Sequence, residues 1–131
     1  MDTQNKIKIE LVKHSEKYTN KLKYESWGNG YLEISDEHFA YKYLVSCIDR
    51  YGYNRNICKE QITHSKLTKN GIEIGFDTLH LYNNKTHDKE WVLLKCNEIK
   101  DFLNSKEFIT EIQIDLERYN RELIELLKTN K

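Results

Sequence analysis

The chain has 131 residues, of which 38% are hydrophobic and 32% are charged, and its formal net charge is zero. This length fits one domain over residues 1–131 and is too short for two independent cores. The neutral balance excludes the strong basic field of a dedicated duplex-DNA binder. Apolar runs stay below the roughly 18 residues of a membrane span, and the N-terminus lacks the apolar core of a signal peptide. We therefore expect a cytosolic protein.

The cysteines agree with that compartment. Cys47, Cys58 and Cys96 are odd in number and widely spaced, without a CxxC pair, so they fit neither a disulfide framework nor a zinc site. We expect no metal or other cofactor. Proline is absent while Lys, Asn, Ile and Tyr are abundant. That bias is typical of AT-rich genomes, such as those of low-GC bacteria and their phages.

Strand patterns dominate the start of the chain. Apolar and charged residues alternate over residues 7–11, the period of a half-buried strand. Two further strand-like runs, 22–27 and 31–34, flank Asn29-Gly30. An Asn-Gly pair in this position predicts a hairpin, because a type I′ turn needs positive φ at both central residues.

A helix is predicted next, with Ser35 as its N-cap and acidic residues in its first turn. Gly52 is placed to end it. Its apolar face would consist of Ala40, Leu44, Cys47, Ile48 and Tyr51. The stretch 53–70 stays open, since three apolar residues suggest a short helix without settling it.

The second half begins with a turn at Asn70-Gly71 and a strand from Ile72 to Phe76, with the alternation changing phase near Asp77-Thr78. Thr86 would cap a helix, and Asn104 the last helix. The first of these helices has apolar residues at helical spacing, namely Val92, Cys96, Ile99 and Leu103.

The last segment has the most regular apolar pattern, with spacings of three and four residues. The positions are Ile109, Ile112, Leu116, Tyr119, Leu123 and Leu126. Ile124 and Leu127 widen this apolar surface. Such a face either packs on its own domain, which is the interpretation we favour, or binds a partner or a second copy. Residues 107–116 also alternate like a strand, so helix and strand both remain open there.

The element order predicts an α+β fold. Strands cluster first and helices last, which indicates an antiparallel sheet covered on one face by helices. The sheet would contain the N-terminal strands, the hairpin and strands near 72–82. Two helices would follow at the C-terminal end.

Tyrosines and basic residues concentrate in the stretch 38–70. The candidate binding residues there are Tyr43, Arg50, Tyr53, Arg55 and Lys59. Tyrosine stacks on bases and arginine binds phosphate, so single-stranded nucleic acid or a nucleotide is one possible partner. The same residue types form protein-binding hot spots, and they also occur as ordinary half-buried side chains.

Catalytic signatures are missing. His64, His80, His87 and Asp88 could converge, but their spacing matches no metal or acid-base motif. There is no nucleophile elbow, no GxGxxG and no phosphate-binding loop. We therefore name no catalytic residue and no metal ligand.

The leading hypothesis is a non-enzymatic protein-binding module that self-associates, with Ile124 and Leu127 among its contact residues. A small inhibitor, an immunity-type protein or an anti-defence protein of a phage or mobile element would suit such a chain. The alternative hypothesis is a nucleic-acid or nucleotide-binding protein that uses the stretch 38–70. No membrane partner is expected.

Overall fold

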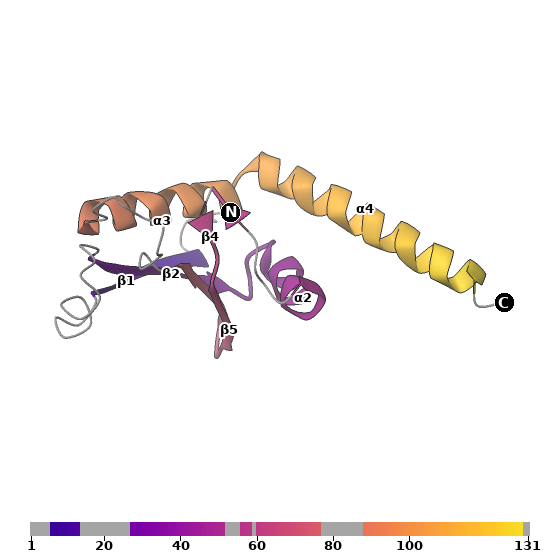
Figure 1. Cartoon of the computed structure of the whole chain (residues 1–131), viewed down its shortest axis with the longest axis horizontal. Coiled ribbons are helices and arrows are strands. Elements are labelled where there is room, and N and C mark those ends of the chain that lie inside the picture. The colour runs from indigo at the N-terminus through magenta and orange to yellow at the C-terminus, as the bar shows by residue number, and fades with distance from the viewer. Residues whose placement is uncertain (1–5, 14–26, 52–55, 59, 77–87, 130–131) are drawn as a thin grey trace.

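A computed structural model of the chain describes residues 6–13, 27–51, 56–58, 60–76 and 88–129 (Figure 1). The strands are β1 (Ile7–Lys13), β2 (Gly28–Ser35), β3 (Asn56–Ile57), β4 (Glu60–Gln61), β5 (His64–Thr68) and β6 (Gly71–Phe76). The helices are α2 (Tyr41–Tyr51), α3 (Lys89–Leu103) and α4 (Lys106–Thr129).

Four strands form one antiparallel sheet in the order β1-β2-β6-β5, and β3 and β4 form a small separate ladder. Helix α3 lies over the sheet, and α2 lies beside it near β6 (Figure 1). The prediction of an α+β fold, with an antiparallel sheet and two C-terminal helices, is confirmed.

The strands divide their side chains between a buried and an open face, because successive residues point to opposite sides. In β2, Leu32 and Ile34 point into the core and are fully buried. Their neighbours in β6 do the same. The buried apolar residues that the structure describes are Ile7, Leu32, Ile34, Ala40, Tyr43, Leu44, Cys47, Ile62, Ile72, Ile74, Phe76, Val92, Cys96, Ile99, Leu103 and Phe108.

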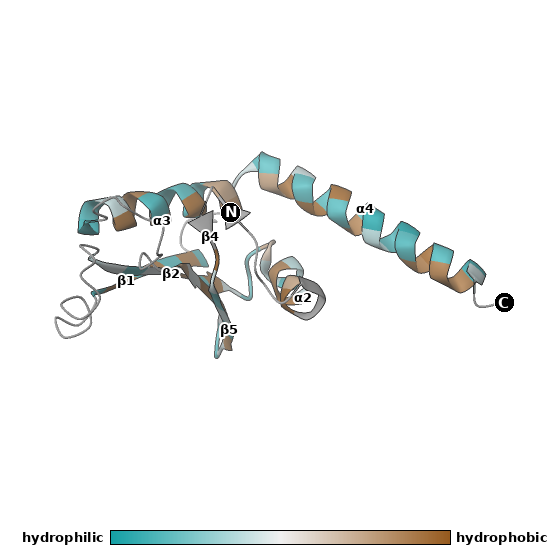
Figure 2. Ribbon diagram, viewed as in Figure 1, coloured by the Kyte–Doolittle hydropathy of each residue, from teal (hydrophilic) through white to brown (hydrophobic). Residues whose placement is uncertain are grey.

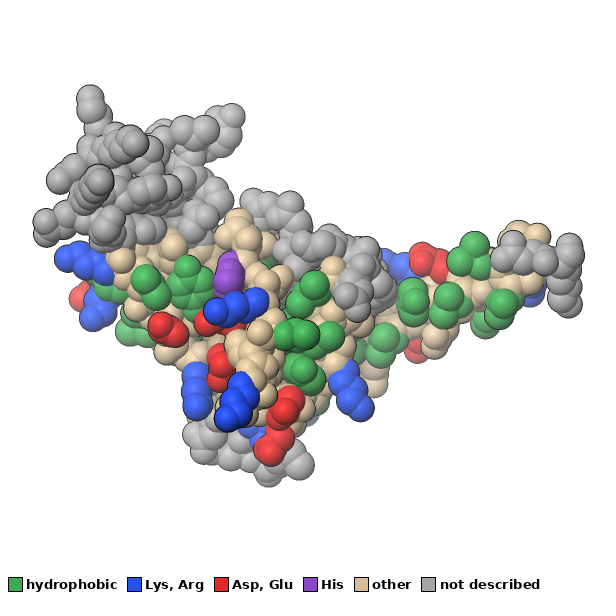
Figure 3. All heavy atoms as spheres, turned by 90° about the horizontal axis from the view of Figure 1, so that it is seen from below, with side chains coloured by type: hydrophobic (Ala, Val, Ile, Leu, Met, Phe, Trp, Pro, Cys, Tyr) green, Lys and Arg blue, Asp and Glu red, His purple; other side chains and the backbone are tan. Residues whose placement is uncertain are grey.

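Most side chains on the open face of the sheet are polar. A row of charged residues crosses the four strands in the order Lys8, Glu33, Glu73 and Lys66. Figure 3 views the molecule from below and shows side chains of both charges interspersed on this side. An antiparallel sheet commonly leaves one face to solvent in this way.

The predicted turn at Asn29-Gly30 is wrong. Both residues lie inside β2, where they pair with Val12 and Leu11 of β1. A Cβ on Gly30 would lie 2.5 Å from Sγ of Cys96 in α3. This glycine is therefore required for the close approach of helix and sheet, which is a known reason for a glycine inside a strand. Residues 22–26 of the predicted first arm lie outside the described residues.

The helix predicted from Ser35 begins six residues later, at Tyr41. Ser35 is the last residue of β2 and pairs with Gly71, and its Oγ accepts a hydrogen bond from the Glu37 N–H at 3.2 Å. Ser and Asp side chains favour turns as well as helix caps, so the local signal was ambiguous. The predicted apolar face is correct for Ala40, Leu44 and Cys47, which are buried, and Ile48 is partly buried. The predicted helix end at Gly52 lies outside the described residues.

The open stretch 53–70 contains strands where the structure describes it, not a helix. β5 pairs with β6, and Thr68 lies opposite Gly71, so the turn consists of Lys69 and Asn70. Pairing with a buried strand favours the extended conformation here. The predicted strand from Ile72 to Phe76 is confirmed as β6, whereas the predicted change of phase after it lies outside the described residues.

The four apolar positions predicted for α3 are each fully buried. Its N-cap is Asp88, whose Oδ1 accepts a hydrogen bond from the Trp91 N–H at 2.8 Å, while Thr86 lies outside the described residues. Asn104 ends α3 instead of starting α4. The cap of α4 is Ser105, whose Oγ accepts from the Phe108 N–H at 3.2 Å.

Helix α4 is continuous from Lys106 to Thr129, so the strand alternative for residues 107–116 is wrong. Among the helices that the structure describes, none is long and apolar enough to cross a membrane.

Candidate interaction surface

Helix α4 is anchored to the domain near its start. Of its residues, all of which the structure describes, Phe108 alone is buried. Its ring lies 5.2 Å from that of Phe102 and 6.0 Å from that of Tyr43, centroid to centroid. The Tyr43 hydroxyl donates a hydrogen bond to Oδ2 of Asp115 at 3.0 Å. Beyond these contacts the helix runs away from the rest of the domain (Figure 1).

We call the six regularly spaced apolar residues of α4 the apolar stripe: Ile109, Ile112, Leu116, Tyr119, Leu123 and Leu126. Figure 2 shows hydrophobic residues along one side of the helix. Ile112 packs partly against the core. The other members are 39–59% exposed. The favoured interpretation, that this face packs on its own domain, is therefore wrong beyond Ile112.

Two residues predicted to bind a partner extend this surface. Ile124 is 51% exposed and Leu127 is 70% exposed. Successive helical residues are separated by 100°, so both lie at one edge of the stripe. A large apolar surface on a helix that leaves its domain commonly marks a protein contact.

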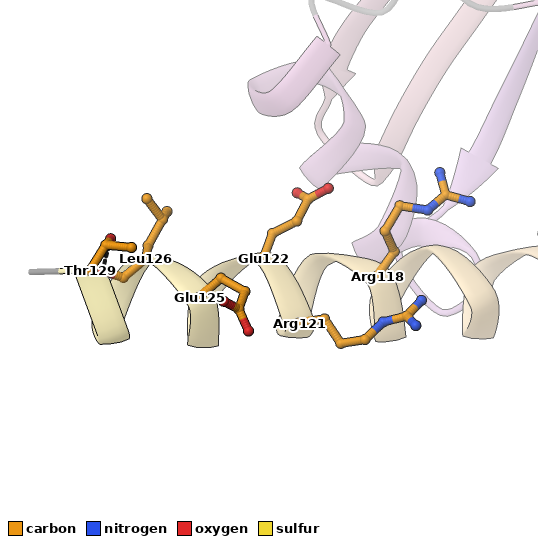
Figure 4. Close-up of a pocket in the computed structure, with 6 residues that line it drawn as sticks. All are labelled: Arg118, Arg121, Glu122, Glu125, Leu126 and Thr129. Carbon is orange, nitrogen blue, oxygen red and sulfur yellow. Dashed lines mark hydrogen bonds between the residues drawn. The ribbon is translucent and has the colours of Figure 1, made fainter.

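The other side of α4 is charged. A shallow depression of about 530 Å³ beside the stripe is lined by Arg118, Arg121, Glu122, Glu125, Thr129 and the stripe residue Leu126 (Figure 4). In Figure 4, Arg118 and Glu122 point to one side of the helix, and Arg121 and Glu125 point to the other. Neighbouring side chains of one helix line it alone, so it lacks the enclosing walls of a small-molecule site.

The structure places one of the candidates from the tyrosine-rich stretch. Tyr43 is 6% exposed and packs against α4. The backbone of Arg50 belongs to α2, but its side chain is not described, and Tyr53, Arg55 and Lys59 lie outside the described residues. The nucleic-acid hypothesis therefore stays a prediction.

The predicted histidine group is only partly described. Nε2 of His64 lies 2.9 Å from Oε2 of Glu73 on the open face of the sheet. Asp88 is occupied as a helix cap, and His80 and His87 lie outside the described residues. No group of three His, Cys, Asp or Glu residues within the described segments could hold a metal ion.

The cysteines that show a shifted pKa are poor nucleophiles. Burial raises the pKa of the Cys96 thiol to about 12. Burial also raises the pKa of the Cys58 thiol, while the nearby Lys95 acts in the opposite direction. Because the thiolate is the reactive form, neither environment activates its cysteine.

Sequence reasoning missed His38, which connects the segment before α2 to Asn104 at the end of α3. It is 3% exposed, and its Nδ1 accepts a hydrogen bond from the Ala40 N–H at 3.0 Å. Its Nε2 therefore carries the proton and donates to Oδ1 of Asn104, 2.7 Å away. A lone histidine between Glu37 and Phe39 has no sequence signal for this role.

We expect the stability of the protein to decrease as the pH falls through about 6.5. Burial lowers the pKa of His38 below its ordinary value of 6.5, and the hydrogen bond to Asn104 offsets part of that effect. The unfolded chain then binds a proton at a higher pH than the folded chain, so acid favours unfolding. An NMR titration should place the His38 midpoint below 6.5.

The matched variant is His38→Asn, which keeps an acceptor for the Ala40 N–H but does not titrate. Its unfolding free energy should change less between about pH 7.5 and 5.5 than that of the wild type. A His38 midpoint at or above the ordinary value would contradict the prediction.

Comparison with protein-family models, curated protein sequences and solved structures finds no match for the chain. The function is therefore inferred from the geometry of α4.

Proposed function

We propose that the protein is a non-enzymatic binding module that contacts other protein chains through the apolar stripe of α4. One observation carries this proposal: α4 holds a regular apolar face that is largely exposed and leads away from its own domain. An amphipathic helix with anchors at spacings of three and four residues is a common element of protein recognition.

The charge of α4 supports a protein partner over nucleic acid. The helix carries 4 basic residues, at positions 106, 118, 121 and 128, against 6 acidic residues. A net negative helix repels phosphate, whereas its apolar stripe gains from burial against another apolar surface.

Small size, free thiols and an exposed binding helix also suit the biological roles suggested by composition. Cys47, Cys58 and Cys96 are thiols that form no disulfide, which favours a reducing compartment, and we place the protein in the cytoplasm as part of this proposal. An inhibitor, immunity-type protein or anti-defence protein would act through such a contact without catalysis.

The experiment is affinity capture with quantitative mass spectrometry from the producing cell. Wild type is compared with Leu116→Glu/Leu123→Glu, which places two charges on the stripe. The control is Arg121→Glu/Glu125→Arg, which keeps the net charge and alters the polar side of the same helix. We expect the stripe variant to lose at least tenfold in captured partner, whether a second copy or another protein.

Circular dichroism must show that both variants stay folded, which is expected because the changed residues are exposed. Equal capture by wild type and the stripe variant would contradict the proposal. Loss of capture in the polar-side control alone would contradict it as well.

A further inference from the structure

We propose that the apolar stripe binds the same stripe of a second copy of this chain, with the two α4 helices antiparallel. This inference rests on the proposed function and names the partner. The described residues give three arguments for it: the symmetry of the stripe, the space around it and the area that it exposes.

The stripe matches itself when reversed. Its spacing of 3-4-3-4-3 residues reads the same from either end. Reversal places Ile109 opposite Leu126, Ile112 opposite Leu123 and Leu116 opposite Tyr119 of the second chain. Each pair occurs twice, which gives six apolar layers around a two-fold axis between residues 117 and 118. A symmetric dimer needs this self-complementary arrangement.

The position of the domain favours the antiparallel direction. Phe108 and the hydrogen bond from Tyr43 to Asp115 hold the domain beside the N-terminal end of the stripe. The C-terminal end projects away from the domain (Figure 1). In an antiparallel pair, the C-terminal end of the partner's α4 lies beside the domain. In a parallel pair, the partner's whole domain would have to fit at that same end of the stripe. Opposed helix dipoles favour the same direction.

The edges of the stripe allow this pairing. On one edge, Gln113 comes opposite Asn120 of the second chain, and both are uncharged. The other edge carries Asp115 and Glu122 of both chains. Arg118 lies three or four residues from each of them, so it places a positive charge within the acidic edge at the crossing point.

The exposed apolar area is sufficient for a weak but specific dimer. Seven apolar residues in the stripe and at its edge, from Ile109 to Leu127, are 39–70% exposed. At roughly 150–200 Å² for a large side chain, they leave about 600 Å² per chain and about 1,200 Å² for the pair. If all of it is buried in the dimer, the interface reaches the lower end of specific interfaces, a range that includes weak and transient complexes.

Light scattering across the micromolar range tests the dimer on purified full-length chain. Wild type should shift from monomer to dimer with concentration. Leu116→Glu/Leu123→Glu should raise the dissociation constant at least tenfold, whereas Arg121→Glu/Glu125→Arg should change it less than threefold. A wild type that stays monomeric, or a stripe variant that dimerises as well as wild type, would overturn the inference.

Spin labels test the direction of the helices. Lys106→Cys and Asn120→Cys are made separately in a Cys58→Ser background. Cys58 is replaced because a label could react with it, whereas Cys47 and Cys96 are buried and can stay. Both labelled positions are exposed and occupy the same place in the seven-residue repeat. In the antiparallel pair, the labels are separated along the axis by about 35 Å at residue 106 and about 8 Å at residue 120.

A parallel pair gives the same label distance at both positions, and that result would overturn the inference while leaving the proposed function intact. A monomer that still captures another protein through the stripe would do the same. If the stripe variant captured every protein, including a second copy of the chain, as well as wild type does, the proposed function itself would be wrong.

Discussion

Gly30→Val is expected to lower the unfolding free energy by about 3 kcal/mol, and Gly30→Ala by about 1–2 kcal/mol, since inserting methyl groups into a packed core forces its neighbours apart. A Cβ at this position would lie 2.5 Å from Sγ of Cys96 and 2.8 Å from Cζ of Phe76. Both neighbours are buried between the sheet and α3, so they have little room to move. Chemical denaturation monitored by circular dichroism measures the effect.

A double-mutant cycle separates this cause from backbone strain. Cys96→Ala removes the sulfur that the new Cβ would meet, so Gly30→Ala should cost less in that background. We expect a coupling of about 1 kcal/mol or more, the range found for residues in direct contact. If Gly30 were instead the second residue of a tight turn, the cost of alanine would not depend on Cys96, and the two changes would be additive.

Gly30 also shows why the local sequence alone does not distinguish a turn from a strand at this position. The pair Asn29-Gly30 between two apolar runs has the same local appearance in a turn and in a strand that a helix approaches closely. The deciding contacts come from Val12, which pairs with Asn29 from seventeen residues upstream, and from Cys96 in α3. No window of neighbouring residues contains that information.

Buried helix faces were easier to predict. Val92, Cys96, Ile99 and Leu103 repeat at helical spacing because one side of α3 covers the sheet along its length. Periodicity reports such burial directly. The start of α2 was missed because Ser35 and Asp36 suit a turn as well as a cap.

The apolar stripe of α4 is predictable from the sequence only in part. Its spacing predicts a helix with one apolar face, and α4 confirms the helix. Spacing does not identify what covers that face, since a core helix and a helix that binds a partner have the same pattern. The distinction depends on the direction in which α4 leaves Ser105, which is set by Phe108 and its neighbours in three dimensions.

Phe108→Ala is expected to lower the unfolding free energy by about 3–4 kcal/mol, the usual cost of removing a fully buried aromatic ring. The ring is 0% exposed and contacts Phe102 at the end of α3 and Tyr43 in α2. Its loss leaves a cavity where α4 joins the domain. Denaturation at submicromolar protein, monitored by the combined fluorescence of Trp27 and Trp91, measures the monomer without a contribution from association.

The matched comparison is Leu123→Ala on the same helix. Leu123 is 41% exposed in the chain alone, so its truncation should cost only about 0.5 kcal/mol under these conditions, as is typical of surface positions. The two variants together test how α4 is attached, because a helix that packed on its own domain along its whole length would lose several kcal/mol at either position. A large effect at Leu123 in dilute protein would therefore show that the stripe belongs to the core. A small effect there, beside a large one at Phe108, would show that α4 is attached to the domain through its first turns and that Leu123 is available to a second chain.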